Sequence, residues 1–154
     1  MAVKEILKFG DKTLKRVSQR VISIDGDIVK LVKDMKDTLY STTGIGLAAP
    51  QIGVLKRVIL IDLRDGSEPI ILINPKVVAK MGTTLGAEGC LSYPNYEGDV
   101  ARPRRVTVQG QNLQGEKVEY TADGLLAKAF CHEIDHLDGI LYVDRAKKVY
   151  KLED

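Results

Sequence analysis

The sequence predicts an α+β domain, with mainly antiparallel sheets arranged around a central helix that carries the motif H-E-x-x-H. Segments rich in β-branched residues fill the middle of the chain, and hairpin-length turns join several of them. Segments with helical periodicity lie toward its two ends, and no alternating strand–helix–strand pattern is visible. The length of 154 residues is enough for one buried core, so we expect a single domain spanning residues 1–154.

Residues 25–41 are predicted to form an amphipathic helix. Its apolar residues recur at the spacing of one helix face: Ile28, Leu31, Val32, Met35 and Leu39. Asp25 or Asp27 is expected to cap its N-terminus, because a carboxylate there accepts hydrogen bonds from free backbone N–H groups. We assign this helix to packing and give it no catalytic role.

A glycine-rich segment, GIGLAAPQIG, follows at residues 44–53. It contains the spacing G-x-G-x-x-A of a dinucleotide-binding fingerprint, but that fingerprint follows a strand and opens a helix. Here a helix precedes the glycines, and Pro50 would interrupt a helix starting at Gly46. Close approach of another backbone, such as an extended peptide substrate, is the better explanation of the small residues. Gln51 offers an amide donor at the end of the segment, although an ordinary surface position would also suit it.

Several segments rich in β-branched residues are predicted to be strands: residues 57–63, 70–73, 76–81, 105–111 and 117–121. The Asp-Gly, Asn-Pro and Gln-Gly pairs between them are typical of turns. The sequence EGCLS at residues 88–92 is expected to lie between strands.

Residues 123–139, DGLLAKAFCHEIDHLDG, are predicted to form the helix that carries the chemistry. Both histidines of the chain lie here, as His132 and His136, and Glu133 follows the first of them. Residues four apart share a helix face, so both imidazoles can bind one divalent metal ion beside Glu133. Asp123 is expected to act as the N-cap, and Gly139 to end the helix in the left-handed conformation.

Two apolar stripes run along this helix. The first is assigned to the core and contains Leu126, Phe130, Ile134 and Leu137. The second contains Leu125, Ala129, His132 and His136. Because the histidines continue this second stripe, we expect the metal at the end of an apolar pocket and a substrate that is partly apolar.

A catalytic metal site commonly has three protein ligands and keeps one position for water, so a third ligand is expected besides the two histidines. Cys90 is the best candidate, although a lone cysteine is often a small buried hydrophobe. Glu88 and Asp138 are rival ligands. Cys131 is a poorer candidate, because it lies about 100° around the helix from His132.

The composition argues against several other classes of protein. Lysine and arginine total 23 against 21 acidic residues, so the net charge of +2 gives no broad footprint for direct nucleic-acid binding. No apolar stretch approaches the length of about 20 residues that spans a membrane, and no secretory signal is recognisable. We therefore expect a cytoplasmic protein with no membrane partner, in which neither of its 2 cysteines forms a disulfide.

Three motifs together resemble those of a known family. GIGLAAPQ, EGCLS and HEIDH, in this order, are similar to the signature motifs of the peptide deformylases, and the similarity runs over residues 6–145. The resemblance implies the α+β deformylase fold and a hydrolase that removes the formyl group from the N-terminal methionine of newly made polypeptides, releasing formate. It also implies one divalent metal ion held by Cys90, His132 and His136, natively Fe²⁺, whereas Zn²⁺, Ni²⁺ or Co²⁺ would also suit the site.

The resemblance also assigns catalytic roles. Glu133 is implied to be the general acid and base, while the Gln51 amide and the backbone N–H of Leu91 are implied to stabilise the oxyanion. Loss of Glu133 is therefore expected to abolish turnover without abolishing metal binding.

Other residues are expected to contact the substrate, an N-formylmethionyl nascent peptide. The resemblance implies that Ile45, Gly46 and Gly89 pair with its backbone. The apolar stripe of Leu125 and Ala129, with Ile45 opposite, is expected to accommodate the methionine side chain.

Three features depart from the family pattern. Cys131 stands where a glutamine commonly precedes the first histidine, and we expect activity to survive this change beside a ligand. Glu97 falls in the region after Pro94 where many members carry an arginine that helps to hold the peptide, so the peptide preference of the family does not carry over. Many bacterial members continue into a long final helix linked to ribosome contact; because this sequence ends at Asp154, we expect at most weak ribosome association.

Two other functions share parts of this pattern: a metallopeptidase with the same helix, and a structural metal site in a peptide-binding module. The EGCLS motif argues against the first, and the second would need a fourth protein ligand. The basic residues Arg102, Arg104 and Arg105 either form a solvated patch, or one of them pairs with Asp135 or Glu88 and holds the metal ligands in place.

Overall fold

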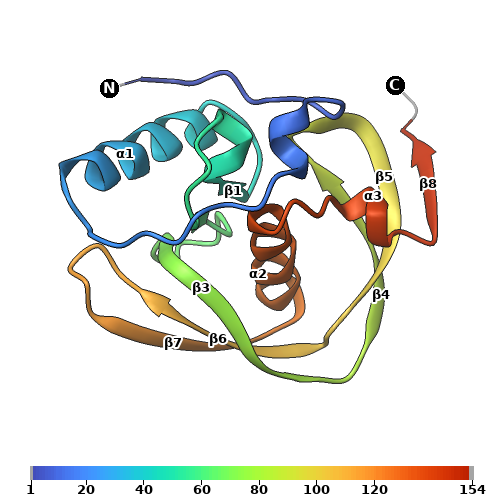
Figure 1. Cartoon of the computed structure of the whole chain (residues 1–154). Coiled ribbons are helices and arrows are strands. Elements are labelled where there is room, and N and C mark those ends of the chain that lie inside the picture. The colour runs from blue at the N-terminus through green and yellow to red at the C-terminus, as the bar shows by residue number, and fades with distance from the viewer. Residues whose placement is uncertain (1, 153–154) are drawn as a thin grey trace.

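The computed structural model describes residues 2–152, so residues 1 and 153–154 of the expected domain lie outside the described part. Two sheets flank the helix α2 (Gly124–Leu137), which carries the H-E-x-x-H motif and occupies the middle of the molecule (Figure 1). All pairings between the strands of these sheets are antiparallel. The predicted α+β class with mainly antiparallel sheet is confirmed.

The larger sheet has the strand order β1-β2-β3-β6-β7. Its strands are β1 (Gly46–Ala48), β2 (Val58–Ile61), β3 (Ile70–Met81), β6 (Arg105–Gln111) and β7 (Lys117–Asp123). Strand β1, which is not predicted from the sequence, lies at one edge of this sheet and pairs with β2 on one side. Its other side is an edge of the kind that an extended peptide can join.

One predicted turn is a bulge. Residues 70–73 and 76–81 form the single strand β3, so the prediction of a turn at Asn74-Pro75 is wrong. The pairing with β6 instead shifts register between Ile73 and Lys76. Asn74 adopts a φ of 53°, which Asn tolerates better than most residues, and its amide bonds the backbone N–H and carbonyl of Val21.

The smaller sheet has the strand order β4-β5-β8 and is not predicted from the sequence. Its strands are β4 (Thr84–Cys90), β5 (Tyr93–Arg102) and β8 (Lys148–Lys151). The expectation that residues 88–92 lie between strands is wrong, because residues 88–90 end β4, and Leu91 and Ser92 form the turn into β5. These segments contain glycines, a proline and charged residues, so their composition does not predict strands. They are stabilised as strands by pairing with each other more than by local propensity.

The helices agree closely with the prediction. Helix α1 (Gly26–Tyr40) begins at the N-cap Asp25, whose carboxylate accepts hydrogen bonds from the N–H groups of Asp27 and Ile28. Helix α2 ends before Gly139, which has the expected positive φ of 74°. The short helices are η1 (Lys12–Lys15), η2 (Ala49–Ile52) and α3 (Tyr142–Arg145).

One capping prediction is only half right. Asp123 occupies the N-cap position of α2, but its carboxylate makes no capping hydrogen bond. It forms a two-pronged ion pair with Arg105 instead, because the two residues face each other across β6 and β7. The cross-strand partner competes with the helix end for the carboxylate.

The two longer helices pack on opposite faces of the larger sheet. Along β2, Ile59 and Ile61 pack with the apolar residues of α2, whereas Val58 and Leu60 pack with those of α1. The α2 residues in this core include Phe130, Ile134 and Leu137, with Leu126 partly buried, as the first apolar stripe predicts. This packing turns the second stripe, and with it both histidines, toward the smaller sheet. No helix within residues 2–152 is long and apolar enough to cross a membrane.

Candidate metal centre

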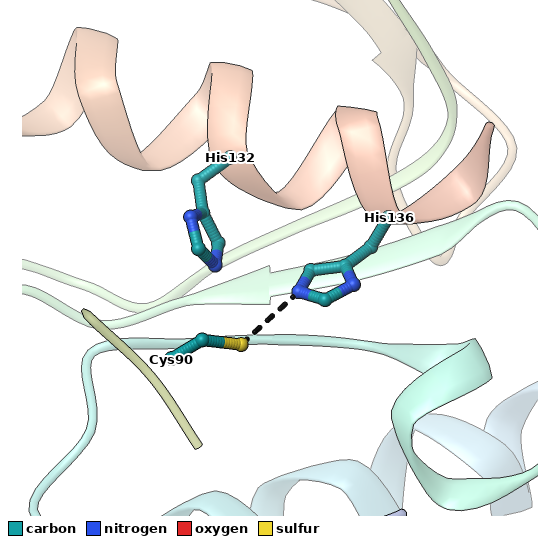
Figure 2. A group of neighbouring side chains, drawn as sticks. All are labelled: Cys90, His132 and His136. Carbon is teal, nitrogen blue, oxygen red and sulfur yellow. Dashed lines mark hydrogen bonds between the residues drawn. The ribbon is translucent and has the colours of Figure 1, made fainter. Parts of the chain in front are cut away.

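The structure brings Cys90, His132 and His136 together. One ligand atom from each lies within 4.8 Å of the others, and the Sγ of Cys90 is 3.3 Å from Nε2 of His136. Figure 2 shows both imidazole rings directed from α2 toward the sulfur at the end of β4. Ligands of a tetrahedral metal with bonds of about 2.0–2.3 Å lie about 3.5 Å apart, so this spacing fits one ion.

The chemistry of the donor atoms also fits a divalent metal. One thiolate and two imidazoles form a donor set that suits borderline-soft ions such as zinc and ferrous iron. Burial and the neighbouring His132 lower the pKa of His136 well below its usual value, which favours the neutral ring that a metal requires. The other ring nitrogen of His136, Nδ1, is buried without a hydrogen-bond partner among residues 2–152.

A buried chain of charges orients His132. Its Nδ1 lies 2.9 Å from Oε1 of Glu88, which leaves Nε2 to face the thiol. Glu88 in turn accepts two hydrogen bonds from Arg102, at 2.7 and 2.9 Å, and Arg102 also donates to Asp135 at 2.6 Å. The sequence left Asp135 and Glu88 as alternative partners of an arginine, and Arg102 binds both. Such carboxylate–histidine contacts fix the ring orientation and raise metal affinity.

This contact gives Glu88 a different role from that of a rival ligand. Burial raises the pKa of the Glu88 carboxyl group. The hydrogen bonds from Arg102 and His132 lower it by more, so the pKa falls to about 2. The carboxylate is therefore charged at neutral pH and is already engaged by both partners. Burial by itself lowers the pKa of the Arg102 guanidinium, because it disfavours the charged form. The contacts with Glu88 and Asp135 raise this pKa by more, so it lies above the usual value.

The remaining rival ligands lie apart from the cluster. Asp138 forms an ion pair with Arg57 at 2.9 Å. Cys131 is buried in the core between α2 and the sheet, and burial raises the pKa of its thiol. Within residues 2–152, neither belongs to the group of potential ligands.

Glu133 lies beside the cluster and is almost fully buried. Burial raises the pKa of its carboxyl group to about 7, so protonated and ionised forms are both accessible near neutral pH. A Cβ atom added to Gly46 would lie 2.5 Å from Oε2 of Glu133, so only glycine lets β1 approach this closely. The glycine-rich segment thus serves close packing, and the short helix η2 that follows β1 differs from the long helix of a dinucleotide fingerprint.

Gln51 and Leu91 reach the same site from η2 and from the β4–β5 turn. The amide of Gln51 is buried, and its Oε1 accepts a hydrogen bond from the N–H of Ala48. Its Nε2 donates to Oγ of Ser92 at 3.0 Å and lies 3.6 Å from Sγ of Cys90. Gln51 is therefore held beside the cluster by its neighbours and is not the surface residue considered as an alternative.

A cavity of about 420 Å³ opens beside these residues. All five residues predicted to contact the substrate line it: Ile45, Gly46, Gly89, Leu125 and Ala129. Leu125 forms an exposed rim, whereas Ala129 is buried deeper. The cavity lining also includes residues that the sequence did not assign to the site, among them Tyr93, Tyr96, Lys128 and Leu152. Three of them lie in or next to the unpredicted strands β5 and β8, so no local pattern indicated them.

The fold and the site together define a class. A three-ligand N/S cluster, a buried carboxyl group that titrates near neutrality and an adjoining cavity are the components of a metal-dependent hydrolase.

Comparison with known proteins identifies the family. The family model described as polypeptide deformylase matches residues 3–151. The chain is 46% identical over 151 residues to the peptide deformylase of Carboxydothermus hydrogenoformans, covering 98% of each chain. It is 51% identical over 153 residues to peptide deformylase 2 of Clostridium perfringens, covering 99% of this chain and 98% of that one. The chain belongs to the polypeptide deformylase family.

Solved structures agree with this assignment. A peptide deformylase from Legionella pneumophila superposes with a TM-score of 0.92 at 41% identity, covering 95% of this chain and 87% of that chain. One from Thermotoga maritima gives a TM-score of 0.91 at 36% identity, covering 96% and 100%. One from Synechococcus elongatus, solved in complex with actinonin, gives 0.90 at 41% identity, covering 94% and 79%.

Proposed function

We propose that this chain is a metal-dependent peptide deformylase, which hydrolyses the N-formyl group of the N-terminal methionine of newly made polypeptides and releases formate. The observation that carries the proposal is the meeting of Cys90, His132 and His136 beside the buried Glu133. The family membership supports the same activity. The site is assigned to one catalytic domain, residues 1–154, acting in the cytoplasm where nascent peptides are made.

Cys90, His132 and His136 would hold one divalent ion. When bound, the ion would supply Lewis-acid chemistry and lower the pKa of water at the site toward about 7. The donor set suits Fe²⁺, Zn²⁺, Ni²⁺ and Co²⁺, and the resemblance of the motifs to those of the deformylases favours Fe²⁺ as the native ion.

Glu133 would act as the general base and then as the general acid. Its carboxylate takes a proton from the water that attacks the formyl carbon, and returns it to the departing amine nitrogen when the C–N bond breaks. A pKa of about 7 suits both steps, because the carboxyl group can accept and release a proton near neutral pH.

Gln51 and Leu91 would stabilise the oxyanion that forms during the attack. The amide of Gln51 is already fixed by Ala48 and Ser92, so little reorganisation is needed to donate a hydrogen bond. The backbone N–H of Leu91 lies in the tight turn between β4 and β5. Each such donor contributes about 3 kcal/mol to the transition state.

The peptide would bind in an extended conformation in the cavity. Its backbone would pair with Ile45 and Gly46 at the open edge of β1 on one side, and with Gly89 of β4 on the other. The methionine side chain would lie against Leu125 and Ala129. Apolar contact at this position would account for the aliphatic part of the cavity lining, Ile45, Leu125 and Ala129.

The test is formate release from formyl-Met-Ala-Ser by protein purified anaerobically with Fe²⁺. Wild type is expected to turn over, whereas Glu133→Ala is expected to lose at least about 10²-fold in kcat while retaining the metal by elemental analysis. Glu68→Ala, an exposed loop glutamate outside the cavity, is the matched control and should retain the rate.

Two outcomes would contradict the proposal. Absence of formate with stoichiometric metal would overturn the reaction, and release of amino acids without formate would indicate a metallopeptidase. A wild-type rate in Glu133→Ala would overturn the role of Glu133 alone.

A further inference from the structure

A second cavity, with a volume of about 300 Å³, lies away from the metal ligands. It shares no lining residue with the cavity beside them. Its lining combines three cations, Arg20, Lys76 and Lys117, with three side-chain amides and two glycines, and it includes no carboxylate. The proposed hydrolysis of a formyl group uses none of these residues.

The second cavity lies on the face of the larger sheet that is turned away from α2. Along β6, Val106 and Val108 pack in the core with α2, so the alternate residues Gln109 and Gln111 point to the other face. Helix α1 packs on that face against β1 and β2. The cavity lies farther across the same face, between β3 and the β6–β7 hairpin.

The bulge in β3 joins the N-terminal segment to this face. The pairing of β3 with β6 shifts register between Ile73 and Lys76, and Asn74 lies within the shift. The Asn74 side chain accepts a hydrogen bond from the N–H of Val21 at 2.8 Å and donates one to its carbonyl oxygen at 2.9 Å. These two bonds fasten the segment that contains Arg20 to the strand that contains Lys76.

The three cations have no ionic partner in the described chain. None of the ion pairs among residues 2–152 includes Arg20, Lys76 or Lys117. All three residues are exposed, although they line one cavity. Like charges around one cavity repel one another, and a multivalent anion bound between them would remove that repulsion.

The carboxylates of the β6–β7 hairpin are engaged elsewhere. Glu119 accepts a hydrogen bond from the amide of Gln109 at 2.7 Å, and Glu116 accepts one from the amide of Asn112 at 3.1 Å. Neither glutamate lines the cavity. They reduce the positive potential of the hairpin, but they leave the ammonium group of Lys117 available to a ligand.

We propose that the second cavity binds the phosphate group of a small phosphomonoester, such as a sugar phosphate or a mononucleotide. A phosphate dianion offers several strong acceptor oxygens, so one arginine and two lysines can bind it together. The volume of about 300 Å³ matches the lower end of the range for small-molecule pockets. The net charge of only +2 argues against the broad basic surface of a nucleic-acid binder. This inference does not depend on the proposed deformylase activity.

The experiment follows the backbone amide signals of the ¹⁵N-labelled, zinc-loaded protein by NMR during titration with glucose 6-phosphate. At about pH 7.5 a phosphomonoester is mostly dianionic. The signals of Gly110 and Gly115, which line the second cavity, should shift with a Kd of about 1 mM, while those of Gly46 and Gly89 beside the metal ligands should not. Glucose, and acetate at the same ionic strength, should shift neither pair. Raising the salt from about 0.05 M to about 0.5 M should weaken the binding.

Variants assign the binding to the three cations. Arg20→Gln, Lys76→Gln and Lys117→Gln should each raise the Kd about fivefold, and the triple variant should show no saturable shift. Lys33→Gln removes an exposed charge of α1 outside the cavity and should bind as the wild type does. Formate release at the wild-type rate identifies the variants that remain folded, and the wild-type titration tests the inference even where a variant does not fold.

Four outcomes would overturn the inference. One is the absence of shifts at Gly110 and Gly115 up to about 20 mM glucose 6-phosphate. Equal shifts with glucose or acetate would show that phosphate is not the recognised group. Binding of an oligouridylate without terminal phosphates at least about tenfold more tightly than glucose 6-phosphate would identify a nucleic-acid site instead. Undiminished affinity in the triple variant would remove the three cations from the site.

Discussion

Replacing Arg102 with methionine should destabilise the protein and weaken its metal site together. Arg102 is 4% exposed and neutralises two buried carboxylates, through bonds of 2.7 and 2.9 Å to Glu88 and 2.6 Å to Asp135. Methionine fills similar volume but leaves Glu88 with His132 alone, and Asp135 with the half-exposed Arg145. Removing one partner from a buried ion pair costs about 3–5 kcal/mol when the remaining charge stays buried without compensation. Because His132 and Arg145 still compensate part of the charge of Glu88 and Asp135, the expected loss lies at the lower end, about 3 kcal/mol.

The metal affinity should fall because the orientation of His132 is no longer fixed. Glu88 holds the His132 ring by its Nδ1, and loss of such supporting contacts lowers metal affinity about 10- to 100-fold. Urea unfolding of the metal-free protein measures the first effect, and competition with a chromogenic chelator measures the second. Arg105→Met is the matched control: its pair with Asp123 is exposed to solvent on both sides, so unfolding free energy and metal affinity should stay close to wild type.

If Arg102→Met lost less than about 1 kcal/mol of unfolding free energy and bound metal as tightly as wild type, Arg102 would have neither role. Loss of stability with unchanged metal affinity would restrict Arg102 to a structural role.

Three further predictions concern the catalytic residues and the metal. Gly46→Ala should lower kcat/KM at least about tenfold without unfolding the protein, because the added methyl group meets Oε2 of Glu133; Gly26→Ala, where a Cβ meets nothing within 4 Å, should leave the rate unchanged. Gln51→Ala should lower kcat about 10²-fold or more while metal analysis finds normal occupancy, and an unchanged kcat would remove Gln51 from oxyanion stabilisation. Saturating Zn²⁺ at about 100 times its Kd should raise the unfolding free energy of the metal-free protein by about 2.7 kcal/mol, and calorimetry should find no such gain in Cys90→Ala.

Local patterns in the sequence were sufficient to predict the two longer helices and to indicate a metal-binding site. The spacing of apolar residues located α1, and the residues on either side of His132 and His136 gave the start and end of α2. Both signals depend on residues within a few positions of one another, which share a helix face or a helix terminus. The antiparallel strands β2, β6 and β7 were likewise visible, because β-branched residues concentrate in them.

The smaller sheet could not be predicted from local sequence patterns. Strands β4 and β5 contain Gly86, Gly89, Pro94 and Gly98, so each segment by itself has the composition of a loop. They are strands because each pairs with the other along its length, and β5 with β8 about fifty residues later. The error at Asn74-Pro75 has the same origin, since pairing with β6 continues the strand across a local turn signal.

The sequence by itself determined the two imidazole donors, the helix that presents them and the glutamate beside them, since all of these follow from residue identity and helical periodicity. For the third ligand, residue identity left Cys90 with the rivals Glu88 and Asp138, and only the resemblance of the motifs to those of the deformylases favoured the thiolate. Only the tertiary structure decided that Cys90 meets the histidines while Glu88 supports His132, that Arg102 joins Glu88 to Asp135, and that Glu97 lines the cavity beside the metal ligands. These contacts join β4, β5 and α2, which are far apart in the chain. The physical reason is that a side chain's role depends on which partners folding brings within reach, and long-range pairing leaves no periodic trace in the sequence.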